Sequence, residues 1–464
     1  MKNTKKSLVL VFLAALHGAP SLMAQGQLTP PNSASPYVSE RALDASGNPV
    51  PSMKTLMQID PGEHLPSRDV AKPNLNGSLG YYELDQPGRY YLTENLDLPV
   101  VIAADNVTLD LAGFELRYSG AGVGPVAIDG AGGATVYHRT RVMNGRIQGA
   151  WIQGALLGDD SSVTHVDVAG MSTYGIKLGE DGLVEQCHVR GPWTQEAGGG
   201  AGPHSGIYVD RASVVTSCTA TGIQGIGILG EDSVRIVDSN VNAVAGCGIV
   251  AAHSASVTGC AVRDCGSTGF DLNQGSALAD CTAINNGDPG VHIRNGCTLI
   301  NVTSLSNQDH GFWVENSGPA PGLLQNATRF VHCVAQSNAG DGFHVRSESA
   351  FKDCTADHNG PQEGPPGLLG NGFAFEDNCR LSDCIASNNA LAGFKGLLGN
   401  TVEGCTASDN GGYGIWVGSD ENVIIRNTLR GNTVGTVNPA PGSNGIAPLQ
   451  APAAATNPFA NFSL

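Results

Sequence analysis

Glycine recurs at a fixed interval along this chain, and no other sequence feature constrains its fold as strongly. Six glycines lie 21 residues apart, and three more resume the interval after two longer units: Gly206, Gly227, Gly248, Gly269, Gly290, Gly311, Gly372, Gly393 and Gly414. A period between about 20 and 50 residues is typical of a solenoid, in which each short unit stacks on the next because none can bury its apolar face alone. We therefore expect stacked coils of about 21 residues.

Each of these glycines opens a short strand pattern, as in Gly269-Phe270-Asp271-Leu272. The second and fourth places are mostly apolar and should point inward, while the third is mixed and should point outward. Further along each unit a small residue, mostly cysteine, is expected to fill the interior. Five residues beyond that place stands an asparagine: Asn286, Asn307, Asn338, Asn359, Asn389 and Asn410. Asparagine suits a tight corner, and stacked asparagine side chains can hydrogen-bond to one another.

Two other solenoids with short periods do not fit this pattern. A leucine-rich repeat needs several leucines per unit, and the segment from Asn285 to Gly290 is turn material with no room for a helix. A hexapeptide β-helix would repeat in multiples of six. A right-handed parallel β-helix remains, the hand preferred for parallel crossovers.

From about residue 100 to 435, the Gly-apolar-x-apolar, Cys-x-Ala and Asn-corner register resembles the pectin-lyase-like β-helix family. The resemblance implies an all-β fold, a right-handed parallel β-helix solenoid of roughly thirteen coils. That family includes lyases, hydrolases, epimerases, phage tailspikes and surface proteins, so the resemblance implies little about chemistry.

Five segments are expected along the chain. Residues 1–24 carry lysines, an apolar run and small residues, the pattern of a signal peptide, so a secreted protein is expected, whether extracellular, surface-bound or periplasmic. Residues 25–52 form a Pro-rich flexible linker, 53–99 an N-terminal cap region, 100–435 the β-helix, and 436–464 a Pro/Ala-rich tail. That tail either caps the last coil or serves as an export or anchoring signal. No other segment is long and apolar enough to span a membrane.

Charge and cysteine placement restrict the partners further. The net charge of −17 argues against a nucleic acid. Eight of the twelve cysteines fall in one inward column: Cys187, Cys218, Cys260, Cys281, Cys333, Cys354, Cys384 and Cys405. Neighbours in that column would be ~4.8 Å apart with parallel Cβ vectors, which does not suit a disulfide, so we expect buried thiols. Cys247 and Cys265 lie outside the column and are the least unlikely pair.

The outward third place carries the candidate functional residues. Successive coils present Tyr208, Leu229, Val250, Asp271, His292, Trp313, His344, Ala374, Lys395 and Trp416. Two residues along, consecutive coils add Arg294, Glu315 and Arg346, so with ~4.8 Å between coils a compact patch is expected. Longer units predict loops at 191–204, 317–327 and 360–370, the last two leaving consecutive coils beside this patch. An extended row with indoles, which stack on sugar rings, fits an extended polysaccharide.

The patch favours one class of reaction. Elimination or C5 epimerisation of a uronic acid sugar needs a base and a cation that stabilises the enolate, roles that His292 or His344 and Arg294 or Arg346 can fill. The predicted substrate-binding residues are Trp313, Glu315, Asp271, Lys395 and Trp416. Hydrolysis needs two carboxylates about 5 to 9.5 Å apart, and Glu315 and Glu376 barely qualify, so a lyase or epimerase is favoured over a hydrolase.

Other interpretations stay open. The chain lacks the Asp-Pro-His-Glu type motif of alginate epimerases and the Gly-His-Gly motif of polygalacturonases, and Asp309-His310-Gly311 resembles only a fragment. Arg294, Glu315, Arg346 and Glu376 alternate in sign and fit a plain ion ladder. A non-catalytic surface, adhesion or spacer protein is then the alternative function.

The sequence predicts no cofactor and no metal site in the patch. A second outward column of Asp238, Asp280, Asp353 and Asp383 keeps Ca²⁺ open as a ligand, against the simpler interpretation that these carboxylates are solvated. The oligomeric state is not fixed by the sequence.

Overall fold

The computed structural model describes residues 63–65, 80–120, 122–133, 135–191, 204–315, 327–360, 370–438 and 442–464. All of them belong to one compact unit, Pro61–Leu464. The predicted signal peptide and linker, and the interiors of the three predicted loops, lie outside the described residues. No helix in the described part is long and apolar enough to cross a membrane.

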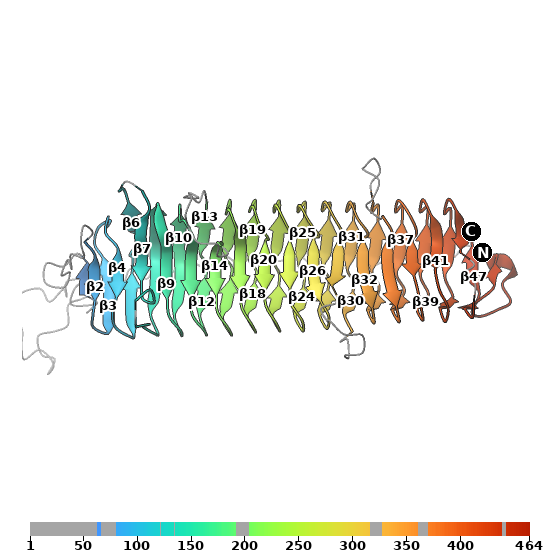
Figure 1. Ribbon diagram of the computed structural model, residues 1–464, viewed down its shortest axis with the longest axis horizontal. Coiled ribbons are helices and arrows are strands. Elements are labelled where there is room, and N and C mark those ends of the chain that lie inside the picture. The colour runs from blue at the N-terminus through green and yellow to red at the C-terminus, as the bar shows by residue number, and fades with distance from the viewer. Residues whose placement is uncertain are drawn as a thin grey trace, which may run out of the picture. The chain divides into compact units, whose positions relative to one another are not determined.

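The described chain is a stack of short parallel strands (Figure 1). One sheet has 16 strands, one from each coil: β2 (Tyr82–Leu84), β4 (Val100–Ile102), β7 (Gly124–Asp129), β9 (Trp151–Leu157), β11 (Tyr174–Leu178), β14 (Ser205–Val209), β17 (Ile226–Gly230), β20 (Ile249–Ala251), β23 (Phe270–Leu272), β26 (Val291–Arg294), β29 (Phe312–Glu315), β32 (Phe343–Ser347), β35 (Phe373–Asp377), β38 (Phe394–Gly396), β41 (Tyr413–Val417) and β44 (Gly435–Val437). We call it the 16-stranded sheet.

The other sheet has 31 strands in two parallel stacks. The first stack holds β1 (Glu63–Leu65), β3 (Gly88–Leu92), β5 (Val107–Asp110), β8 (Arg141–Gly149), β10 (Ser162–Ala169), β12 (Leu183–Glu185), β15 (Val214–Thr216), β18 (Arg235–Val237), β21 (Ser256–Thr258), β24 (Ala277–Ala279), β27 (Thr298–Ile300), β30 (Arg329–Val331), β33 (Ala350–Lys352), β36 (Arg380–Ser382), β39 (Thr401–Glu403), β42 (Val423–Ile425) and β45 (Gly445–Ile446). The second stack holds β6 (Glu115–Tyr118), β13 (His188–Arg190), β16 (Thr219–Thr221), β19 (Asn240–Asn242), β22 (Ala261–Arg263), β25 (Thr282–Ile284), β28 (Thr303–Leu305), β31 (Val334–Gln336), β34 (Thr355–Asp357), β37 (Ile385–Ser387), β40 (Thr406–Ser408), β43 (Thr428–Arg430), β46 (Leu449–Gln450) and β47 (Asn461–Ser463). A 3₁₀ turn, η1 (Pro452–Ala454), lies in the tail.

One regular coil shows why 21 residues close a turn of the solenoid. Strand β23, in which only Asp271 faces outward, is followed by β24, after which Asp280 adopts a left-handed backbone with φ of 54°. The chain bends there, continues as β25, and bends again at Asn285, also with φ of 54°. Asparagine and aspartate tolerate this conformation better than most residues, which accounts for their recurrence at the corners.

The predicted all-β fold class of stacked parallel coils is confirmed. The 16 strands of one sheet exceed the roughly thirteen coils expected. The excess lies at the N-terminal end, where β2, β4 and β7 pair in register although their coils lack the regular glycine phrase. The period of the later units therefore underestimated the number of coils.

Aromatic and amide side chains stack along the interior. The Phe312 and Phe343 rings, and the Phe343 and Phe373 rings, lie parallel with centroids 4.6 Å apart. At one corner, asparagines that are buried in all coils but the last form a ladder in which each side-chain amide nitrogen donates to the side-chain oxygen of the asparagine in the next coil. It runs through Asn286, Asn307, Asn338, Asn359, Asn389, Asn410 and Asn432. These bonds satisfy amide groups that would otherwise be buried without partners.

The C-terminal tail continues the stack. β47 pairs in parallel with β43, and the buried Asn461 accepts a hydrogen bond from Asn427 Nδ2 at 3.0 Å. Phe459 is 48% exposed and lies under the Arg426 guanidinium, 5.0 Å from its centre. The tail therefore covers the last coil chiefly through backbone pairing and Asn461.

All twelve cysteines are free thiols, and eleven of them are buried. In the inward column each thiol lies near the carbonyl oxygen two residues earlier, as Cys281 Sγ does at 3.0 Å from Ala279. Burial raises the pKa of Cys265 and of Cys379 to about 12, so these thiols stay protonated and unreactive.

We expect Asn338→Ala to lower the free energy of unfolding by about 2 to 3 kcal/mol, because it removes the side-chain oxygen that accepts from the buried Asn307 backbone nitrogen and amide, and one of the two donors to Asn359 Oδ1. Urea unfolding followed by circular dichroism measures this. Asn240→Ala, at an exposed position of β19, is the matched control and should change stability by less than about 0.5 kcal/mol. Equal effects of the two changes would contradict a stabilising ladder.

Thiol titration with a chromogenic disulfide, without reductant, should find few reactive cysteines in the native protein. In denaturant most of the twelve should react, because the inward column holds buried thiols rather than disulfides. A denatured protein with almost no free thiols would contradict the observed packing.

Candidate functional site

One outward column of the 16-stranded sheet runs through every coil from β2 to β41. Its register places Asp271, His292, Trp313 and His344 on successive strands, as predicted. Ala374, Lys395 and Trp416 follow on the next three strands. Because neighbouring strands lie ~4.8 Å apart, these side chains form one row although more than 140 residues separate its ends in the sequence.

His292 lies in the middle of the patch but is largely enclosed. Its Nδ1 is 3.0 Å from Asp271 Oδ1, and its ring stacks on the Trp313 indole with centroids 4.6 Å apart. The side chain is 11% exposed, and Nε2 has no hydrogen-bond partner and faces Glu315 Oε2 at 3.5 Å. His292 is therefore placed to support Trp313 rather than to reach a ligand.

His344 has a different environment, which is set by a buried carboxylate. Its Nδ1 is 2.8 Å from Oδ2 of Asp341, whose side chain is fully buried, while His344 itself is 28% exposed. Asp341 Oδ1 accepts two hydrogen bonds from Asn371, from the backbone nitrogen at 2.8 Å and from Nδ2 at 2.9 Å. Burial alone would raise the pKa of Asp341, but the hydrogen bond from His344, the nearby His310 and the Asn371 backbone lower it overall.

These bonds determine the tautomer of His344. An ionised Asp341 can only accept, so Nδ1 of His344 must carry a proton and donate it. In the neutral ring the lone pair is then on Nε2. The arrangement is an oriented imidazole held by a carboxylate, which in turn is held by an amide.

His310 extends this group of residues. Its ring stacks on His344 with centroids 4.5 Å apart and planes 23° apart, and its Nδ1 accepts a hydrogen bond from the Asp341 backbone nitrogen at 2.9 Å. Burial, and then the charge that His344 acquires when protonated, lower the pKa of His310. His310 is thus a neutral ring beneath His344.

His310, Asp341 and His344 offer three ligand atoms within 4.8 Å of one another, which prompts the question of a metal ion. An imidazole binds a metal in its ring plane at about 2.0 to 2.1 Å. The two ring planes are nearly parallel and do not meet within that reach, and His310 Nδ1 already accepts a hydrogen bond. In this arrangement the three residues form a hydrogen-bonded network, not a metal cage.

The predicted basic residues divide into a paired and an unpaired arginine. Arg294 Nη2 is 3.4 Å from Glu315 Oε2, so its charge is largely neutralised. Arg346 is exposed, and the ion pairs of the described residues do not include it or Glu376. The alternating charges therefore form one pair and not a continuous ladder.

Lys395 and Trp416 form a separate pair, because Ala374 lies between them and His344. The Lys395 ammonium lies 5.7 Å from the centre of the Trp416 ring. The surface predicted as one patch thus has a centre at His292, Trp313 and His344, with an outlying cation and indole two and three strands beyond His344.

The aspartate column considered for Ca²⁺ lies at the corners. Asp238, Asp280, Asp353 and Asp383 all have left-handed backbones. Asp280 accepts a hydrogen bond from Asn301 and Asp353 pairs with His332, so neighbouring coils supply their partners. The left-handed backbone of the turn accounts for aspartate at these four positions.

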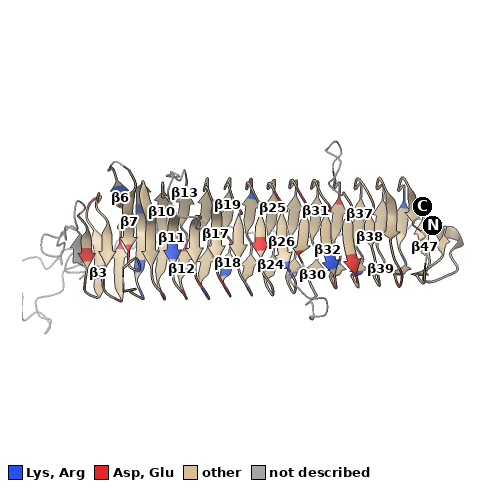
Figure 2. Ribbon diagram, in the orientation of Figure 1, with Lys and Arg blue, Asp and Glu red and all other residues tan. Residues whose placement is uncertain are grey.

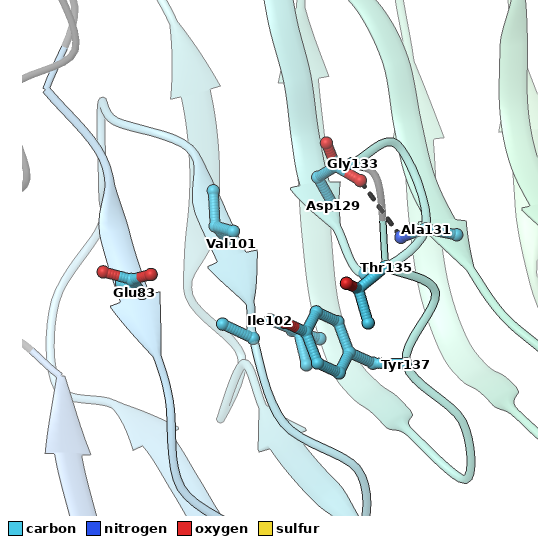
Figure 3. Close-up of a pocket in the computed structure, with 10 residues that line it drawn as sticks. Glu83, Val101, Ile102, Asp129, Ala131, Gly133, Thr135 and Tyr137 are labelled. Atoms are coloured by element: carbon cyan, nitrogen blue, oxygen red, sulfur yellow. Dashed lines mark hydrogen bonds between the residues drawn. The ribbon is translucent and has the colours of Figure 1, made fainter.

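A cavity of about 250 Å³ opens on the same sheet near its N-terminal end (Figure 3). It lies between Glu83 on β2 and Asp129 on β7, with Val101 of β4 between these two residues in the register. The Asp129 carboxylate accepts hydrogen bonds from the Ala131 and Gly132 backbone nitrogens, so it stabilises its own turn.

Asp341, Asn371 and the role of His310 were not predicted from the sequence. All three stand immediately before the glycine of their unit, a place that Thr268, Pro289, Ala392 and Tyr413 occupy in neighbouring coils. His310 and Asp341 occupy this place in two adjacent units, and this pair of polar residues could have indicated a functional site. Whether a side chain at this place is buried could not be read from strand alternation, because the chain is turning there.

A sequence profile described as "Right handed beta helix region" matches residues 153–308 and 224–391, which together cover more than half of the 464 residues. The chain belongs to this right-handed β-helix family. The predicted hand of the solenoid and the resemblance to pectin-lyase-like proteins are thereby confirmed. A comparison with curated proteins gives no match.

Solved β-helix structures are similar in fold at low identity. The Dettilon tailspike protein aligns at 12% identity and a TM-score of 0.42 over 71% of this chain. The alignment covers only 61% of the tailspike chain. The periplasmic alginate epimerase AlgG aligns at 10% identity and 0.36 over 84% of this chain and 86% of its own. Pectate lyase Pel9A aligns at 18% identity and 0.35 over 59% and 71%. These similarities concern the fold alone.

We expect Asp341→Asn to lower the free energy of unfolding at pH 7 by about 2 kcal/mol, because the amide cannot accept from His344 as the carboxylate does. The folded pKa of Asp341 lies below its usual 3.8, so its stabilisation is present above about pH 4 and is lost as the pH falls through the folded pKa. Urea midpoints of wild type and variant should therefore converge in acid.

Glu376→Gln, an exposed carboxylate on β35, is the control and should leave the midpoints nearly unchanged at each pH. A constant difference between Asp341→Asn and wild type down to pH 2 would show that the carboxylate charge is not the source of the stabilisation.

Proposed function

We propose that the protein binds an extended polysaccharide bearing uronic acid groups along the outward column of the 16-stranded sheet, and that it acts on this polymer by elimination or C5 epimerisation. The observation that carries the proposal is the Asp341–His344 hydrogen bond at 2.8 Å. It leaves His344 Nε2 as a proton acceptor at the surface, within the only row of aromatic and basic side chains that the sequence singled out.

His344 is the base, and His292 is not. His292 Nε2 is buried against Glu315, whereas His344 is partly exposed and its tautomer is fixed by an ionised carboxylate. A base of this kind removes a proton from the carbon next to a carboxylate, because the electron pair can move into that carboxylate. Reprotonation of C5 by water from the opposite face gives the epimer. Cleavage of the C4–O bond instead gives an unsaturated uronate, and the oxygen of the departing sugar takes a proton from water.

A cation and a stacking surface lie beside this base. Arg346, two residues along β32, is exposed and unpaired among the described ion pairs, so it is the arginine available to balance charge on the substrate carboxylate. Trp313, on the preceding strand, is supported from below by His292. Hydrolysis fits less well, because Glu315 is already paired with Arg294 and close to His292.

The first test uses polygalacturonate and alginate as acidic polymers and dextran as a neutral one. Calorimetry measures binding. Turnover is measured by the absorbance of unsaturated products or by NMR of epimerised ones. Trp313→Ala should weaken binding of the acidic polymer about 10-fold, because an aromatic contact is lost. His344→Ala should abolish turnover with binding changed less than about 2-fold, and Asp341→Asn should lower turnover by a factor on the order of 10² or more, because it favours the wrong tautomer.

His253→Ala is the matched control. His253 is also bonded to an aspartate, with Nδ1 3.1 Å from Asp232, but it is exposed and lies outside the column, so its loss should change neither binding nor turnover. Binding without turnover in the wild type would remove the catalytic half of the proposal. Failure to bind any acidic or neutral polymer, with or without Ca²⁺, would favour a surface, adhesion or spacer role.

A further inference from the structure

The same outward column carries a second cluster of aromatic and basic side chains, far from His344. Lys177 on β11 is in register with Tyr208 on β14. Its ammonium lies 5.0 Å from the centre of the Tyr174 ring and 4.9 Å from that of Tyr208, and the two rings meet edge to face with centroids 5.8 Å apart. One lysine is thus held by the side chains of two tyrosines.

Lysine is rare in the described chain, and its placement is selective. The described residues hold three lysines, Lys177, Lys352 and Lys395. Two of the three lie on this one column, and each of these lies over the ring of the residue with which it is in register on the next strand. Figure 2 shows how sparse basic residues are on this face, with blue on β11 and β32.

Acidic neighbours do not account for Lys177. Among the ion pairs of the described residues it has none, although the chain carries 42 acidic residues against 25 basic ones. Glu231 accepts a hydrogen bond from Tyr208 Oη at 3.2 Å instead. Burial and the charge of Glu231 raise the pKa of Tyr208 well above its usual value, so the hydroxyl stays protonated and donates. The Lys177 charge therefore remains uncompensated beside two ring faces.

We infer that Tyr174, Lys177 and Tyr208 form a remote subsite for the same acidic polysaccharide, with the ammonium facing a substrate carboxylate and a tyrosine ring facing a sugar. This rests on the proposed function. β11 and β32 are seven strands apart in the sheet, a distance of about 34 Å. Only a ligand that runs along the column over that length reaches both His344 and Lys177.

With a remote subsite, the affinity for the polysaccharide depends on its length. Two sites joined by one chain act together, because binding at the first raises the effective concentration at the second. A short oligomer fills the central patch and does not sense Lys177, whereas a polymer longer than the separation gains from both. The central patch and the remote subsite can therefore be tested separately.

The experiment measures binding of polygalacturonate and alginate, each as polymer and as short oligomer, to the full chain. Lys177→Ala should weaken polymer binding about 5-fold and leave oligomer binding unchanged, because one anion contact of the pair is lost. Lys177→Arg should restore most of the loss. Lys352→Ala, an exposed lysine on β33 in the other sheet, is the matched control and should have no effect on either ligand.

The remote subsite is overturned if Lys177→Ala and Lys352→Ala bind the polymer with equal affinity while Trp313→Ala still weakens binding of the oligomer. The proposed function would then still stand. A loss of oligomer binding in Lys177→Ala equal to its loss of polymer binding would also overturn it, since the effect would not depend on length. If the wild type binds neither acidic probe, both the subsite and the proposed function are wrong.

Discussion

The structure depends on parallel strands that stack in register about 4.8 Å apart. Because every coil repeats the same path, a residue at one place of the unit lies directly over the residue at that place in the next unit. The interior columns of phenylalanine, cysteine and asparagine follow from this, and so does the outward row of the 16-stranded sheet. A single substitution therefore acts on two neighbours in space that are about 21 residues away in sequence.

The same stacking assembles the candidate site from a few side chains of each coil. Each coil supplies one or two side chains, and a base with its supporting groups needs at least three coils: β29 follows His310, β32 carries His344, and β35 follows Asn371. Asp341 is the centre of the arrangement, since it orients His344, is held by Asn371, and bonds His310 through its backbone. Its burial would be costly without these partners, which is the expected condition for a buried carboxylate.

Charge is distributed unevenly over this acidic chain. Seven arginines of the described residues form ion pairs, as Arg294 does with Glu315 and Arg426 with Glu403. Lys177 and Lys395 lie on the outward column, and Arg346 lies two residues beyond it on β32. The described ion pairs include none of the three, and the two lysines lie over aromatic rings. Local charges, rather than the net charge of −17, set the electrostatic field at contact distance from this face.

The sequence by itself determined the repeat, the parallel β-helix, the inward thiols and asparagines, and the outward row that brings His292, Trp313 and His344 together. A strict period fixes which residues share a column, and alternation within a strand fixes which of them face outward. Only the tertiary structure decided that His292 is enclosed, that Arg294 is paired, and that Asp341 orients His344. These depend on side-chain conformation and on the path of the chain through the corner before each glycine, where alternation no longer tells inside from outside.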